Sequence, residues 1–200
     1  VVKAVAKIDE TYYATLPAAV EAAQENKIVK LLDNATGAGV VIDKDVTIDF
    51  AGFTYSFNEG VGSTGTKTNG FQILKGNTVT LKNGTLNVAE EAQNKFYILV
   101  QNYANLNVEN MNLDGTNLDK WSTVATDLDS YVLSNNSGNV NIVNTTITAN
   151  DEGAKAFAFD VCKKASYEAP VVTLDAESTI NGRVELSGGQ FYPEQGVTVS

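Results

Sequence analysis

A pattern of eight residues recurs along the chain and decides the fold. Its first full copy is Val79-Thr80-Leu81-Lys82-Asn83-Gly84-Thr85-Leu86, in which two short apolar–polar alternations flank an Asn-Gly turn. Further copies begin at Leu106 and Val140, and weaker copies begin at Val46 and Val172. Repeats spaced by roughly 30 residues, each with two short strands around a turn, are typical of a β-solenoid.

The alternation within each copy predicts which side chains form the core, because successive side chains of a strand point to opposite faces. The residues predicted to point inward are Val79, Leu81, Leu86, Leu106, Val108, Leu113, Val140, Ile142 and Ile147. A further strand begins with an aromatic residue in each of four repeats, at Phe71, Tyr97, Tyr131 and Phe157. We expect each of these aromatic-led strands to open a coil, so that the coils share a common order of strands.

Asn83, Asn110 and Asn144 occupy the same place in three successive copies. Asparagine tolerates the left-handed backbone of a tight turn, and its amide can bond to the equivalent amides above and below. We therefore predict a structural asparagine ladder, buried at an interior turn, rather than a ligand site. Phe50 and Ala176 take this place at the two ends, so the ladder should span only the middle coils.

The first 45 residues differ from the repeats and predict a cap with the first coil. Thr15 stands where a helix N-cap would, Pro17 lies just inside, and an alanine-rich stretch follows. We expect a short amphipathic helix over residues 15–26 that covers the open end of the solenoid. Residues 46–200 would form the β-helix coils, so the chain is one domain, expected to be a fragment of a larger protein.

The chain resembles the pectin-lyase-like superfamily. The motifs that carry the resemblance are Tyr13-Ala14-Thr15-Leu16, Leu31-Leu32-Asp33-Asn34 and Val46-Thr47-Ile48-Asp49, which are similar to the opening of β-helical repeat regions in bacterial cell-surface proteins. The resemblance implies an all-β fold, a single-stranded right-handed parallel β-helix of about five to six coils. It also implies an extracellular location or a place on the surface of a bacterium.

The composition excludes several classes of function. With 24 acidic and 14 basic residues the formal net charge is −10, which argues against nucleic acid and anionic membranes as partners. The chain has no histidine, which removes Ser-His-Asp and Cys-His nucleophiles and histidine-based zinc sites. Cys162 is the single cysteine and permits no internal disulfide. No apolar run approaches the roughly 20 residues of a membrane span, so membrane insertion is not expected.

Four loops are expected to form one wall along a corner of the solenoid, because a solenoid stacks equivalent positions. They cover residues 58–70, 89–94, 114–129 and 149–156. The third loop holds the only tryptophan, and an exposed indole is a platform for a sugar ring while nearby polar groups bond its hydroxyls. The candidate ligand-binding residues are Asp119, Lys120, Trp121, Asp127 and Asp129. The alternative is that Trp121 packs the loop against the solenoid.

Calcium is a second possibility for the carboxylates of these loops. Asp127, Asp129 and Asp151 could bind it together with loop carbonyls, although neither an EF-hand spacing nor a calcium-binding nonapeptide repeat is present. We therefore predict no cofactor and no metal ligand set, and keep calcium as the alternative.

No catalytic set is predicted. Enzymes of the superfamily that the chain resembles use either clustered acids with an Arg or Lys base, or several Asp residues with a Gly-His-Gly motif. This chain has no histidine, and Arg183 is its only arginine. We expect a non-enzymatic surface or secreted domain, structural or adhesive, whose partner is a glycan or another surface protein domain. The alternative is a polysaccharide lyase or glycoside hydrolase that acts through loop carboxylates such as Asp119, Asp127 and Asp129.

Overall fold

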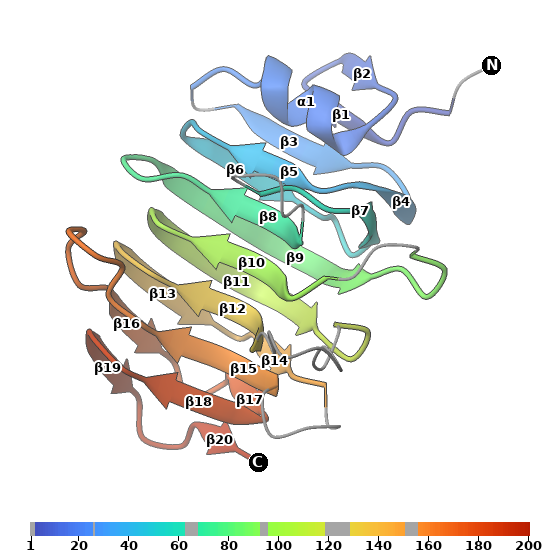
Figure 1. Cartoon of the computed structure of the whole chain (residues 1–200). Helices are drawn as coiled ribbons and strands as arrows, with labels where there is room; N and C mark the ends of the chain where they lie inside the picture. Colours follow the sequence, from blue (N-terminus) through green and yellow to red (C-terminus); the bar gives the residue numbers. More distant parts are fainter. Residues whose placement is uncertain (1–2, 26, 63–67, 93–95, 119–128, 151–155) are drawn as a thin grey trace.

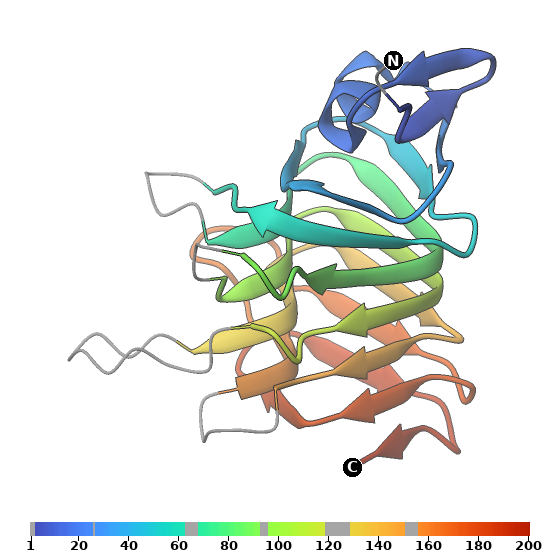
Figure 2. The same ribbon diagram turned by 90° about the vertical axis from the view of Figure 1, so that its right-hand side faces the viewer.

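The architecture is taken from a computed structural model that describes residues 3–25, 27–62, 68–92, 96–118, 129–150 and 156–200. This part of the chain is mostly β-strand, with parallel sheets and one short helix (Figure 1). The arrangement is compatible with the all-β solenoid that the repeats predict. Successive turns of the chain lie on top of one another, from the capped N-terminal end to the C-terminal end (Figure 2).

Three stacks of parallel strands form the walls. The first stack contains β3 (Ile28–Leu31), β6 (Val46–Asp49), the first halves of β9 (Thr78–Val88) and β11 (Asn105–Asp114), β13 (Asn139–Val143), β16 (Val171–Leu174) and β19 (Gln190–Pro193). The second contains β4 (Ala35–Ala38), β7 (Thr54–Glu59), the second halves of β9 and β11, β14 (Thr146–Thr148), β17 (Thr179–Asn181) and β20 (Thr198–Val199). The third is a six-stranded sheet of β5 (Val40–Ile42), β8 (Asn69–Ile73), β10 (Ile98–Asn102), β12 (Ser130–Asn135), β15 (Ala156–Val161) and β18 (Arg183–Leu186).

Each turn visits the three stacks in the same order, and each strand of the inner turns pairs in parallel with the strand one turn earlier and the strand one turn later. The pairing of β9 with β11 is the longest, from Thr78 opposite Asn105 to Asn87 opposite Asp114. Both strands bend where the first stack meets the second. A residue therefore meets its counterparts of the neighbouring turns at the parallel-strand spacing of about 4.8 Å.

The cap consists of a hairpin and a helix. β1 (Ala6–Ile8) and β2 (Thr11–Tyr13) are antiparallel, and β1 also pairs antiparallel with β3. In α1 (Leu16–Ala22), the Oγ1 atom of Thr15 accepts a hydrogen bond from the backbone N–H of Ala18, as the N-cap prediction requires. The predicted helix end at residue 26 is wrong: Ala23 is already extended, with ψ 132°. The chain has to leave the helix there because it enters β3 only a few residues later.

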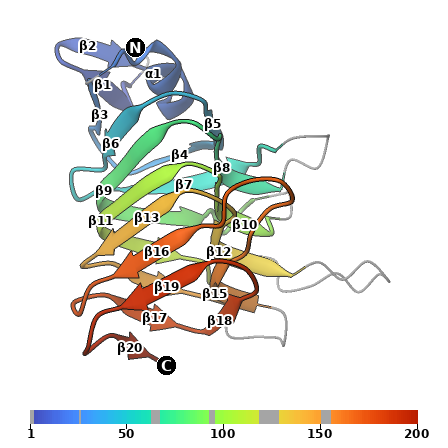
Figure 3. The same ribbon diagram turned by 90° about the vertical axis from the view of Figure 1, so that its left-hand side faces the viewer.

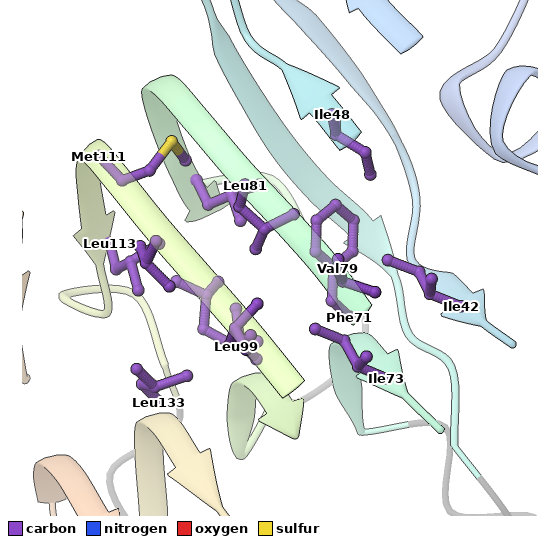
Figure 4. Close-up of a cluster of buried hydrophobic side chains, with 14 of the residues drawn as sticks. Ile42, Ile48, Phe71, Ile73, Val79, Leu81, Leu99, Met111, Leu113 and Leu133 are labelled. Atoms are coloured by element: carbon purple, nitrogen blue, oxygen red, sulfur yellow. The ribbon is translucent and has the colours of Figure 1, made fainter. Parts of the chain in front are cut away.

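The core lies between the three stacks and follows the predicted alternation. All nine residues predicted to point inward are buried, each at most 2% exposed, which confirms that part of the sequence analysis. The third stack completes the core with side chains such as Phe71, Ile73 and Leu99 (Figure 4). At the capped end, Leu16, Ala19 and Val20 of α1 are buried against the first turn.

The three ladder asparagines have left-handed backbones, with φ of 61°, 53° and 44° for Asn83, Asn110 and Asn144. Asn110 donates its side-chain amide to Oδ1 of Asn83 at 3.2 Å, and Asn144 donates to Asn110 at 2.8 Å. At the ends, Asp49 accepts from the Asn83 amide and Asp175 accepts from the Asn144 backbone N–H. These contacts form a side-chain ladder that closes on a carboxylate at both ends.

The prediction that the ladder is buried is wrong. Asn83 is half-buried, while Asn110 and Asn144 are exposed. The left-handed residue interrupts the alternation, so that the asparagine faces solvent and the following residue faces the core. Met111 and Thr145 are accordingly buried, and a Cβ at Gly84 would lie only 2.3 Å from the Cβ of Phe50. The sequence requires a glycine there because Phe50 fills that corner of the core.

The prediction that an aromatic residue leads each of these strands is only partly right, since β8 begins at Asn69 and β10 at Ile98. Tyr131 pairs with Phe157, and their rings stack with centroids 5.1 Å apart. Phe71, however, pairs with Val100, and Tyr97 lies just before β10. Strands of the third stack are buried almost throughout, so the apolar pattern does not fix their register.

Two variants at Asn110 separate the contribution of the ladder hydrogen bonds to stability from that of the left-handed backbone. We expect Asn110→Ala to lower the free energy of unfolding by about 1–2 kcal/mol. The substitution removes two side-chain hydrogen bonds, and it places alanine at a positive φ that alanine disfavours. Asn110→Gly removes the same contacts but accepts positive φ, so it should cost less. Urea denaturation of both variants measures the difference, and equal losses would contradict a role for the backbone conformation.

Candidate functional site

The four predicted loops leave from one edge of the structure. β7, β9, β11 and β14 end there in the second stack, and β8, β10, β12 and β15 begin there in the third, each in parallel register with the next. Of the predicted ligand-binding residues, Asp119, Lys120, Trp121 and Asp127 lie outside the described residues. Asp129 is described and exposed, immediately before β12.

The base of the third loop is firmly anchored. Leu118 is buried at 2% exposure, and its carbonyl accepts a hydrogen bond from the side-chain amide of Asn150 at 2.8 Å. The amide of Asn117 donates to the carbonyl of Val88 at 3.0 Å. Asp114 accepts from both the backbone N–H and the hydroxyl of Thr116. These contacts hold the start of the loop on the coils, and they engage the Asp114 carboxylate in a turn.

A row of polar side chains runs along the outer face of the third stack, and the sequence analysis missed it. The pairing register places five residues of successive turns in this polar row: Gln72, Gln101, Ser134, Asp160 and Glu185. The strands that carry them lie side by side in Figure 3. These five residues are aligned only by the register of the strands in the third stack. The signal in the sequence was a polar residue directly after Phe71, Val100, Leu133 and Phe159.

Hydrogen bonds link the members of the row to one another. Oε1 of Gln101 accepts from the amides of Gln72 at 2.9 Å and of Asn69 at 2.8 Å. The hydroxyl of Ser134 donates to Oδ2 of Asp160 at 3.1 Å. The row therefore changes from amides in β8 and β10 to a hydroxyl and carboxylates in β12, β15 and β18.

Asp160 is the least exposed acid in the row, at 4%. Its Oδ1 accepts from the backbone N–H of Asn135 at 2.6 Å. Burial raises the pKa of Asp160 from the ordinary 3.8 to about 7, against the lowering effect of the hydrogen bonds from Asn135 and Ser134. The negative charge of Glu185, in the next strand, raises the pKa of Asp160 further. Asp160 consequently changes its charge near neutral pH.

Aromatic rings flank the carboxylate end of the row. The hydroxyl of Tyr131 lies 2.8 Å from Oε2 of Glu185 and 3.4 Å from Oδ2 of Asp129. Its single proton can serve only one of these carboxylates at a time. Burial and the hydrogen bond to Glu185 raise the pKa of Tyr131, so the hydroxyl stays protonated. The ring stacked on Phe157 is half-buried and gives the face an aromatic surface beside hydrogen-bonding groups.

A second aromatic pair lies where the segment between β15 and β16 packs against the turns above it. The rings of Tyr103 and Tyr167 meet edge to face at 5.7 Å, and Nζ of Lys75 lies 4.8 Å from the Tyr167 ring centre. The backbone N–H of Lys164 donates to the carbonyl of Asn136. Burial, together with Tyr167 and Asp160, raises the pKa of Tyr103. Tyr103 is thus close enough to Asp160 of the polar row for the charge of Asp160 to affect it.

The rest of the described chain has fewer polar and ionisable side chains gathered in one place. A concavity of about 280 Å³ beside α1 is lined by residues that include Leu16, Gly37 and Tyr55, and the Tyr55 hydroxyl is engaged by the Ala38 carbonyl. No group of three or more His, Cys, Asp or Glu residues that could hold a metal occurs among the described residues. The calcium candidates Asp127 and Asp151 lie outside them. No helix in the described ranges is both long enough and apolar enough to cross a membrane.

Comparisons with protein-family models, with curated proteins and with solved structures found no match to this chain. The fold and the polar row therefore carry the functional argument alone. They define an all-β protein with parallel sheets and a polar, partly aromatic outer face on its third stack.

Asp160 should make the stability of the protein depend on pH. The folded protein keeps a proton on Asp160 that the unfolded chain has already released, so this contribution is full below about pH 4 and is lost as the pH rises towards the folded pKa. Asp160→Asn cannot ionise. We compare the free energy of unfolding of the natural protein with that of Asp160→Asn. As the pH rises from about 4 to about 7, this difference should change against the natural protein by up to about 1.4 kcal/mol per pH unit.

Urea denaturation at a series of pH values measures this difference. Glu185→Gln is a useful companion variant, because loss of the negative charge lowers the pKa of Asp160 and should move the upper end of the window to lower pH. Parallel stability curves for the natural protein and Asp160→Asn would contradict the raised pKa.

Proposed function

We propose that this chain is a non-enzymatic carbohydrate-binding domain of a bacterial surface or secreted protein, structural and adhesive in role. Its fold would be a single-stranded right-handed parallel β-helix similar to the pectin-lyase-like superfamily. The parallel strand pairing and the three stacks support this architecture. The partner would be a glycan, with another surface protein domain as the alternative. The observation that carries the proposal is the polar row with its flanking Tyr131–Phe157 pair.

The chemistry of the row suits an extended sugar chain. Amides and hydroxyls both donate and accept hydrogen bonds, as the hydroxyls of a sugar do, and an aromatic ring supplies an apolar surface for the face of a pyranose. Gln72, Ser134 and Asp160 are buried at 4–5% exposure, so a ligand would meet the row at Gln101 and Glu185, while the buried members hold those side chains in place. Gln101 and Tyr131 are only half-buried, so they are accessible to a ligand.

The described end of the third loop lies next to the polar row. Asp129 ends the third loop and contacts Tyr131, which in turn contacts Glu185 of the row. Asp129 is therefore the one candidate from the sequence that the structure describes beside the row, and Trp121 lies outside the described residues. Calcium held by the loop carboxylates remains part of this proposal.

A glycan array with purified protein tests the proposal, with and without calcium. We expect Gln101→Ala to weaken binding about tenfold, because it removes hydrogen bonds to the ligand worth roughly 1–1.5 kcal/mol. Asn107→Ala is the matched control, since Asn107 is also a half-buried amide of a central turn but lies in the first stack and bonds to Thr80. Binding that Asn107→Ala leaves unchanged and Gln101→Ala reduces would support the polar row.

Two other outcomes are informative. Loss of binding in Trp121→Ala with Gln101→Ala unaffected would place the ligand on the loop wall alone and reject the row as its site. An array with no specific binding would overturn the carbohydrate proposal and favour a protein partner.

Catalysis is the second candidate, and one observation favours it. Asp160 has a pKa of about 7, which suits a general acid, and Glu185 occupies the next position of the row. A polysaccharide lyase or glycoside hydrolase would use these groups or the loop carboxylates Asp119, Asp127 and Asp129. Release of reducing ends or unsaturated uronides from a polysaccharide panel, lost in Asp160→Asn or Asp127→Ala, would establish it. A panel without any product would reject it.

A further inference from the structure

Residues 162–170 connect β15 to β16 as an irregular segment, which we call the strap. The strap rises beside β10 in Figure 3, where the Tyr167 ring packs on the ring of Tyr103. Most of its side chains are exposed, and Ala165 has a left-handed backbone with φ 43°, which alanine disfavours. Few buried contacts and local strain are typical of a segment that opens while the rest of the fold stays intact.

Two backbone hydrogen bonds anchor the strap to the end of β12. The N–H of Cys162 donates to the carbonyl of Asn135 at 2.9 Å, and the N–H of Lys164 donates to the carbonyl of Asn136 at 3.0 Å. The strap can open only if these two bonds break. Exchange of the two amide hydrogens with solvent therefore reports on its opening.

Asp160 holds both residues whose carbonyls anchor the strap. Its Oδ1 accepts from the backbone N–H of Asn135 at 2.6 Å, and its carbonyl accepts from the Asn135 side-chain amide at 3.0 Å. Its Oδ2 accepts from the hydroxyl of Ser134 at 3.1 Å, and Oγ of Ser134 accepts from the side-chain amide of Asn136 at 3.0 Å. All four residues are at most 8% exposed. The state of one carboxyl group is thus coupled to both anchors.

We propose that the strap is a pH-responsive cover, which closes over Asp160 while this side chain carries a proton and opens as the side chain ionises. Closing removes the carboxyl group from water, and this costs the charged form more than the neutral form.

The sign of the pH dependence follows from proton linkage. With the strap closed, burial raises the pKa of Asp160 to about 7, whereas a solvated carboxyl group would titrate near the ordinary 3.8. The closed form therefore binds the proton more tightly than the open form. This contribution to closure is complete below about pH 4 and is lost as the pH rises towards 7.

The other charged and titratable groups near Asp160 come from several elements. Glu185 of β18 raises the pKa of Asp160 through its negative charge. Burial raises the pKa of Tyr131 in β12 and of Tyr103 after β10 above the ordinary 10, so neither tyrosine ionises between pH 4 and pH 7. Further groups, on the strap and at the end of the third loop, are Tyr167, Lys163, Lys164 and Asp129. Glu185 is thus the acid whose effect has to be separated from that of Asp160.

Opening of the strap would change the outer face of the third stack. Ser134 and Asp160 are members of the polar row that are each 4% exposed with the strap closed. An open strap would make both accessible to water and to a ligand. The switch itself does not depend on what the row binds.

Hydrogen exchange of the Lys164 backbone N–H, followed by NMR from pH 4 to pH 7, tests the proposal. The measured quantity is the protection of this amide relative to an unstructured chain at the same pH. In the natural protein we expect the protection to fall by up to about tenfold per pH unit, because the open form gains population as Asp160 ionises. In Asp160→Asn, which cannot ionise, the protection should not change with pH.

Two variants serve as controls. Asp49→Asn changes another half-buried acid that accepts from a backbone N–H, in β6 and far from the strap, so the fall in protection should remain. Glu185→Gln leaves Asp160 to titrate without the neighbouring charge, so the fall should remain and should end at lower pH.

Low concentrations of urea distinguish opening of the strap from global unfolding. Local opening exposes little surface, so the protection of the Lys164 N–H should hardly respond to urea. The same pH dependence of protection in the natural protein and in Asp160→Asn would overturn the proposal. So would a urea dependence of the Lys164 N–H equal to that of global unfolding.

Discussion

Parallel backbone pairing between successive turns is the interaction on which the rest of this structure depends. Each strand of the inner turns has a partner one turn earlier and one turn later, so a residue there meets the same kind of neighbour above and below. An inward-facing column stays apolar except where a polar side chain finds a backbone partner, as Thr145 does with the carbonyl of Val143 and the N–H of Met111. The columns through Leu81 and Leu86 show this continuity from turn to turn.

The same constraint organises the polar side chains. A polar residue at an equivalent outer position finds another polar residue above and below it, which produces the ladder of Asn83, Asn110 and Asn144 and the row that contains Gln101 and Asp160. The two arrays differ in their surroundings. The ladder faces solvent, whereas Asp160 is almost fully covered, and this burial moves its pKa to near neutrality. Stacking therefore explains both the asparagine ladder, which stabilises the fold, and the polar row, which contains an acid with a raised pKa.

The ends of such a structure need separate solutions, because an end residue has a neighbour on one side only. At the N-terminal end the chain supplies its own cover, with α1 and an antiparallel hairpin in place of a further turn. At the C-terminal end of the described structure, β18, β19 and β20 each pair with another strand on one side only.

The sequence by itself determined the features that depend on local periodicity: the strands of the repeats, their inward side chains, the left-handed asparagines and the helix start at Thr15. These follow from alternation and from backbone preferences within a few residues. Only the tertiary structure decided the register of the third stack, the solvent-facing side of the ladder, the gathering of Gln101, Asp160 and Glu185, and the pKa of Asp160. Each of these depends on residues roughly one turn away, about 30 positions along the chain, and strands buried on both faces carry no alternation that could reveal their alignment.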